Sequence, residues 1–124
     1  IGTMPKQTEV RSKSQKLLDA IDWAIAQNAD PKSPYYQKLD TKKIAVSGMS
    51  CGGLQTLEVA GDPRITTVGV FNSGVLPNPG GGMPGMPQVT KAQLNNIKVP
   101  TLYLLGGKSD IAYGNGMDDF ARIN

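Results

Sequence analysis

The part of the sequence that most restricts the fold is residues 43–60, where a strand pattern gives way abruptly to a helical one. The apolar run from Ile44 to Val46 is too short for a helix and is typical of a strand covered on both faces. Helical character returns from Cys51 to Ala60 and stops at the Gly-Asp-Pro signal of residues 61–63. Because glycines crowd residues 48–53, we expect a tight turn that passes directly from strand into helix.

Two further β-rich runs follow, and the alternation of strands with helices predicts an α/β fold, a three-layer α/β/α arrangement around a partial parallel sheet of about three strands. A strand, a helix and a second strand in succession imply a right-handed parallel crossover. The expected elements are a helix at 8–28, a strand, turn and helix at 43–60, a strand at 65–72, a mobile loop rich in Gly, Pro and Met at 74–87, a short helix near 90–95, a strand and its exit loop at 99–110, and a helix at 117–123.

Three apolar strands make a poor sheet on their own, because both edges would leave backbone groups unpaired. Strands of this composition are normally interior, and a complete doubly wound enzyme needs more of them. We therefore expect further strands, a partner chain or self-association to complete the sheet.

The turn itself carries the pattern Gly-x-Ser-x-Gly, with Ser50 at its centre. In this context, between a strand and a helix, the pattern is typical of a nucleophile held on a strained turn whose neighbours must lack bulk, which explains Gly48 and Gly52, with Gly53 beside them. Ser50 is the candidate nucleophile, and the backbone amide of Cys51, at the helix start, is the candidate oxyanion donor. The alternative for the turn is a glycine-rich connection that only packs closely. The thiol of Cys51 fits a structural buried cysteine, which is compatible with a role for its amide.

A carboxylate follows the third β-rich run, where Gly106 and Gly107 lead to Asp110. The order serine then aspartate suits a triad acid, and Asp110 is the candidate. On its own, Asp110 would fit a turn former or a helix cap equally well. Asp118 and Asp119 are weaker candidates, because carboxylates are favoured in the first turn of a helix, where we expect both of them.

Composition narrows the other possibilities. The chain has no histidine and one cysteine, so it lacks the commonest catalytic-metal ligand and cannot form an internal disulfide, and we expect neither a metal nor a cofactor. The net charge of +3 comes from dispersed basic residues, which fit a solvated helix face better than a nucleic-acid site. No apolar run approaches the roughly 20 residues of a membrane span. Residues 80–85 fit Gly-x-Gly-x-x-Gly, but Pro84 and Pro87 prevent the helix that a dinucleotide needs.

Residues 43–55, 72–74 and 99–110 together resemble the α/β-hydrolase superfamily, in particular dienelactone-hydrolase-like members and secreted esterase or lipase-like members. The resemblance covers nearly the whole chain. It implies a small ester as substrate, Ser50 as nucleophile, the Cys51 amide as oxyanion donor and Asp110 as acid. The early strands of such enzymes and their late loop with the catalytic histidine have no counterpart in these 124 residues.

The resemblance thus implies a serine hydrolase of carboxylic esters that works through an acyl-enzyme, to which this chain contributes nucleophile and acid but no histidine. We expect the 124 residues in isolation to be nearly inert, and we expect the rest of a hydrolase fold or a second copy to cover the strand edges. The alternative is a noncatalytic hydrolase-like module that uses those edges for binding or assembly. The sequence does not determine the cellular compartment, and the resemblance allows a secreted protein.

Overall fold

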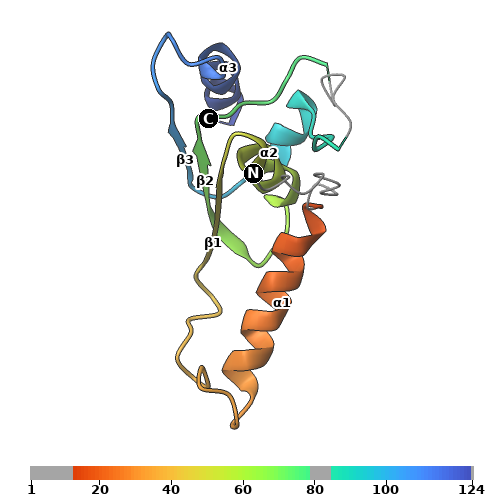
Figure 1. The fold of residues 1–124 in the computed structure, drawn as a ribbon, viewed down its shortest axis with the longest axis vertical. Coiled ribbons are helices and arrows are strands. Elements are labelled where there is room, and N and C mark those ends of the chain that lie inside the picture. Colours follow the sequence, from red (N-terminus) through yellow and green to blue (C-terminus); the bar gives the residue numbers. More distant parts are fainter. Residues whose placement is uncertain (1–12, 79–84, 124) are drawn as a thin grey trace, which may run out of the picture.

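The structure is a computed structural model that describes residues 13–78 and 85–123. It is an α/β arrangement with one parallel sheet of three strands, which confirms the predicted fold class. Figure 1 shows the elements in chain order, which are α1 (Gln15–Ala29), β1 (Ile44–Met49), α2 (Cys51–Val59), β2 (Ile65–Phe71), the 3₁₀ helix η1 (Lys91–Asn96), β3 (Thr101–Leu104) and α3 (Tyr113–Ile123).

The sheet has the order β1-β2-β3, and both pairings are parallel, so the central strand β2 holds the other two in register. Val46 of β1 lies opposite Val68 of β2, and Val70 lies opposite Tyr103 of β3. These side chains share one face of the sheet because successive residues of a strand point to opposite faces. Val68 and Val70 are fully buried there, in one core with apolar side chains of α2.

The opposite face of the sheet is open in the described residues. Met49, Leu102 and Leu104 are 65%, 57% and 59% exposed, although all three are apolar. The expectation that the strand beginning at Ile44 is covered on both faces is therefore wrong for the described residues. The reason is that the helices packed against the sheet lie on the side of Val46 and Tyr103.

Helix α1 packs beside α2 and extends past the end of the sheet (Figure 1). Its residue Ile21 is buried in the common core, and an ion pair from Asp22 to Arg64 ties it to the turn before β2. Arg64 also binds Asp62 through its side chain, at 2.9 Å. The helix was expected at residues 8–28, of which 8–12 lie outside the described residues.

Two of the expected boundaries change in ways that affect the site. Helix α3 begins at Tyr113 and not at residue 117, so Asp118 and Asp119 lie in its middle and not in its first turn. The loop expected to be mobile at 74–87 has both of its described ends in the core, with Val75 fully buried and Met86 9% exposed, whereas residues 79–84 lie outside the description. In the described parts of the chain, no helix is both long enough and apolar enough to span a membrane.

Candidate active site

Ser50 occupies a strained turn between β1 and α2. Its φ is 54° and its ψ is −118°, in a region that residues with a side chain rarely adopt. Four hydrogen bonds hold the turn in place. The Ser50 N–H donates to the carbonyl of Phe71 at 3.1 Å. The Ser50 carbonyl accepts from Gly53 N–H at 3.0 Å, from Leu54 N–H at 3.2 Å and from the Ser73 hydroxyl at 2.7 Å. Both β2 and α2 therefore fix the backbone on which the Ser50 hydroxyl is carried.

The glycines around Ser50 are not equivalent. A methyl group on Gly48 would lie 2.2 Å from the carbonyl oxygen of Gly52, and one on Gly53 would lie 2.5 Å from Cβ of Ser73. A methyl group on Gly52 would meet no described atom within 4 Å beyond its chain neighbours and the adjacent backbone of α2. The structure therefore requires the absence of a side chain at positions 48 and 53, whereas the described residues leave open space at position 52.

Cys51 is the first residue of α2, and its backbone and side chain face different surroundings. The backbone N–H of a first helical residue lies at the positive end of the helix dipole, where negative charge is stabilised. The thiol is half-buried, and its Sγ lies 3.5 Å from Sδ of Met86. The side chain thus packs against the core, in agreement with the structural cysteine that the sequence suggested.

Asp110 lies in the loop between β3 and α3, and backbone donors fix its carboxylate. Its Oδ2 accepts from Gly106 N–H at 3.1 Å and its Oδ1 accepts from Ala112 N–H at 2.9 Å, while Gly107 takes a φ of 85° to form the turn. These are the contacts of a turn-forming aspartate. Each carboxylate oxygen has a second lone pair, so the turn and a further acceptor role are compatible.

Ser50 and Asp110 lie at the same edge of the sheet, since parallel strands end together and these residues follow β1 and β3. Between them, β2 ends in Asn72, which also has a positive φ, of 42°. A methyl group on Gly106 would lie 3.4 Å from Oδ2 of Asp110 and 3.7 Å from Oδ1 of Asn72, so both side chains lie beside Gly106 at the end of β3. No role was predicted for Asn72 from the sequence, although asparagine is among the residues that most often adopt a positive φ.

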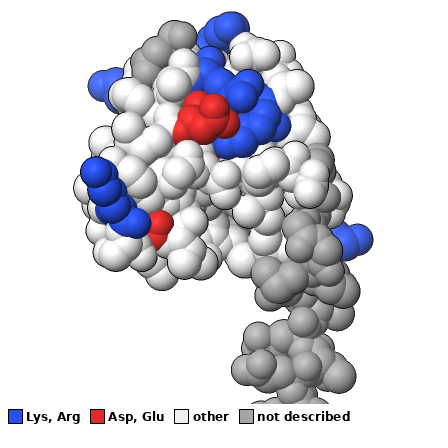
Figure 2. Space-filling view, turned by 90° about the horizontal axis from the view of Figure 1, so that it is seen from above, with Lys and Arg blue, Asp and Glu red and all other residues white. Residues whose placement is uncertain are grey.

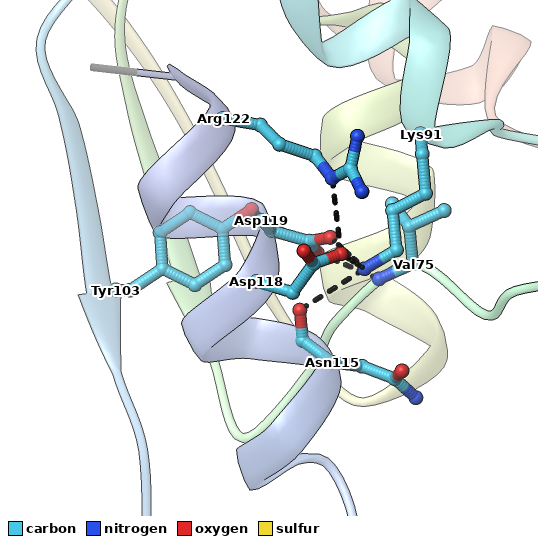
Figure 3. A network of polar contacts seen from close by, with 7 residues as sticks. All are labelled: Val75, Lys91, Tyr103, Asn115, Asp118, Asp119 and Arg122. Carbon is cyan, nitrogen blue, oxygen red and sulfur yellow. Dashed lines mark hydrogen bonds and ion pairs between the residues drawn. The ribbon is translucent and has the colours of Figure 1, made fainter.

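Asp118 and Asp119, the weaker candidates for the acid, belong to a network on α3 (Figure 3). Asp119 is fully buried and forms an ion pair with Lys91, and Asp118 contacts Lys91 at 2.8 Å and Arg122 at 3.0 Å. Burial raises the pKa of Asp119, whereas hydrogen bonds from Arg122 and Lys91 lower the pKa of Asp118 to about 2. Both carboxylates are thus engaged with cations of this network.

The end of the molecule at which the strands finish is mostly uncharged. Seen from that end, acidic and basic side chains gather in a few places, and the surface between them is white (Figure 2). No cluster of three or more His, Cys, Asp or Glu side chains suited to a metal occurs within residues 13–78 and 85–123.

Comparison with known proteins identifies similar sequences. Residues 1–117 match a family described as PETase, PET hydrolase-like. Among curated proteins, the chain is similar to one named Protein usf from Aquifex pyrophilus, with 30% identity over 82 residues. The matched segment is 65% of this chain and 31% of that relative, so the chain spans about a third of the relative's length.

Proposed function

We propose that this chain, which belongs to the PET hydrolase-like family, supplies the nucleophile and the acid of a serine hydrolase of carboxylic esters. The family comprises α/β-hydrolase-type cutinase- and esterase-like enzymes. The backbone conformation of Ser50 is the observation that carries the proposal. Its φ is 54°, on a turn between strand and helix, and turns of this kind present a serine hydroxyl at the end of the sheet where the strands finish. Strain of this kind persists where the surroundings enforce it, and it gathers at functional sites.

In the proposed reaction, Ser50 Oγ attacks the ester carbonyl carbon and a histidine from outside these 124 residues accepts its proton. The N–H of Cys51 stabilises the oxyanion, and Asp110 orients the imidazole and stabilises its protonated form. The carbon–oxygen bond to the alcohol then breaks, and the histidine returns the proton to the departing alcohol. Water hydrolyses the acyl-enzyme by the same sequence and restores Ser50.

The arrangement of the strands supports this division of roles. Neighbouring strands lie about 4.8 Å apart, so about 10 Å separates β1 from β3, with β2 between them. An imidazole fits between a hydroxyl and a carboxylate carried on two such strands. The largely uncharged surface at this end supports a neutral ester as the substrate (Figure 2).

The same proposal gives the rest of the polypeptide a structural role. The edge strands β1 and β3 have no second neighbour among the described residues, and Met49, Leu102 and Leu104 are exposed on one face of the sheet. Burying apolar surface of this kind is worth about 25 cal/mol per Å². We propose that further segments of a hydrolase fold cover this face and pair with these edges.

The test uses the full-length polypeptide that carries this sequence, with p-nitrophenyl butyrate as substrate and a fluorophosphonate as the label. We expect the label on Ser50, with a loss of kcat on the order of 10⁵ in Ser50→Ala and about 10⁴ in Asp110→Asn. The matched control is Ser47→Ala, which removes a hydroxyl from the same strand, on the sheet face opposite Val46, and should keep kcat within about two-fold. A full-length protein that neither turns over the ester nor takes the label would rule the proposal out.

The second candidate is a noncatalytic binding or assembly module, favoured by the open apolar sheet face and by the absence of histidine from the chain. Under this alternative, the full-length protein leaves the ester intact. Its oligomeric state would instead depend on Leu102 and Leu104, which the change of both residues to serine would reveal by light scattering.

A further inference from the structure

A fully buried carboxylate, that of Asp119, joins four parts of the chain. Oδ2 of Asp119, on α3, accepts the backbone N–H of Val75 at 2.7 Å, and Oδ1 forms an ion pair with Lys91 at the start of η1 (Figure 3). The same Lys91 ammonium donates to the carbonyl of Asn115 at 3.2 Å and contacts Asp118. The Tyr103 hydroxyl of β3 also donates to Oδ2 of Asp119, at 3.5 Å, so four segments of the chain meet at one carboxylate.

This arrangement is costly for a feature that serves stability alone. Removing an ionised carboxylate from water carries a large desolvation penalty, and replacing a buried pair by apolar side chains often stabilises a protein. The exposed neighbour Asp118 shows that α3 also offers a carboxylate in water, paired with Arg122. A role of the buried pair in fixing the relative positions of the segments that it joins would account for this cost.

The segment that Asp119 holds leads directly to the Ser50 turn. Val75 follows Ser73 by two residues, and the Ser73 hydroxyl donates to the Ser50 carbonyl. The backbones are in close contact here, since a methyl group on Gly74 would lie 2.4 Å from the backbone nitrogen of Gly116 in α3. A movement of α3 away from this segment would therefore shift Ser73 and its hydrogen bond to the Ser50 carbonyl.

The other end of α3 leads to the candidate acid. The N–H of Tyr113, the first residue of the helix, donates to the Asp110 carbonyl at 3.0 Å, and Ala112 N–H donates to the Asp110 carboxylate. The helix thus carries the Asp110 loop at its start and the anchor Asp119 in its middle. One rigid element connects the acid to the segment that supports the nucleophile.

We infer that Asp119 and Lys91 form a positioning pair, in which the bond from Val75 N–H to Asp119 sets the spacing between Ser50 and Asp110. The inference rests on the proposed function and deepens it, because neither residue touches the substrate. The tether is the bond to Val75, and the ammonium of Lys91 neutralises the carboxylate that makes it. Reacting groups misplaced by about 1 Å can lose on the order of 10²-fold in rate, so a partial loosening should cost about ten-fold.

The test compares two double variants of the full-length protein. Lys91→Met with Asp119→Leu removes the buried charges and the tether, whereas Lys91→Met with Asp119→Asn removes the charges but keeps an amide oxygen for Val75 N–H. We measure kcat and KM for p-nitrophenyl butyrate, with kcat divided by the number of sites that react with a fluorophosphonate, and thermal unfolding in parallel. Dividing by the number of reactive sites counts folded protein alone, so kcat can be compared between variants of different yield.

We expect kcat per reactive site to fall about ten-fold in the leucine variant, with KM within about two-fold, and to return to within about three-fold of wild type in the asparagine variant. The control Arg122→Gln loses its exposed ion pair to Asp118 but keeps the contacts of Lys91 and Asp119, and should stay within about two-fold. Equal kcat values in the two double variants would overturn the inference. A wild-type protein without labelling at Ser50 would instead refute the proposed function, so the two failures are distinguishable.

Discussion

Gly48 and Gly52 flank Ser50 symmetrically in the sequence, yet alanine should have opposite effects at the two positions. At Gly48, the added methyl group would lie 2.2 Å from the carbonyl oxygen of Gly52 and 2.3 Å from the carbonyl carbon. Both atoms belong to the backbone, so the turn itself would have to move by about 1 Å to reach ordinary contact. Overpacking costs about 1–3 kcal/mol, and a rigid backbone neighbour favours the upper end, so we expect Gly48→Ala to lower the free energy of unfolding by about 3 kcal/mol.

At Gly52, the methyl group would enter open space within the first turn of α2. Alanine is a better helix former than glycine by about 1 kcal/mol in a helix interior, and it narrows the conformations of the unfolded chain. We therefore expect Gly52→Ala to raise the free energy of unfolding by about 0.5–1 kcal/mol. Urea denaturation of the full-length protein, followed by circular dichroism, measures both changes. Equal destabilisation by the two substitutions would refute the reasoning, because it would mean that the turn tolerates a side chain at neither position.

Three further predictions concern strain, charge and activity. Ser50→Gly should raise the free energy of unfolding by about 1 kcal/mol in urea denaturation, because glycine accepts a φ of 54° without strain, while it abolishes labelling by a fluorophosphonate. Hydrogen bonds from Arg122 and Lys91 lower the pKa of Asp118 in the folded protein from 3.8 to about 2. The contribution of this carboxylate to the free energy of unfolding is therefore present above about pH 4 and lost as the pH falls toward about 2. Asp118→Asn should make the free energy of unfolding less dependent on pH in this range, which urea denaturation at pH values from about 2 to 5 measures. The 124 residues expressed alone should hydrolyse p-nitrophenyl butyrate no faster than their own Ser50→Ala variant, because the chain contains no histidine to accept the serine proton, and a serine-dependent esterase rate would contradict this.

The regular elements near Ser50 could be predicted because local signals agree there. A short apolar run, a glycine-rich turn and a helical run ending at Gly61 occur in succession, and β1 and α2 follow them closely. The parallel pairing of β1 with β2 was also predictable, because a helix connects them. The catalytic roles of Ser50 and Asp110 stay predictions, which only the experiments on the full-length protein can test.

Other features depend on contacts between distant segments, and sequence patterns do not report those. The crowding at Gly48 arises from the path of the chain through Gly52, and the open space at Gly52 arises from what lies outside the helix. Asp119 looked like a first-turn carboxylate, because the sequence gives no sign that α3 begins at Tyr113 or that Lys91 reaches it from 28 residues away. The burial of Val75 was equally hidden within a segment rich in glycine and proline.

The apolar sheet face described above has a practical consequence for anyone who produces this region alone. Leu102 and Leu104 lie on the same side of β3, and Met49 of β1 is exposed on the same face of the sheet. The recombinant region would therefore bind hydrophobic dyes and precipitate as its concentration rises. Serine or threonine at both leucine positions would leave the buried side untouched, since alternate residues of β3 point away from it. Such a solubilised fragment would let NMR spectroscopy follow the Ser50 turn directly.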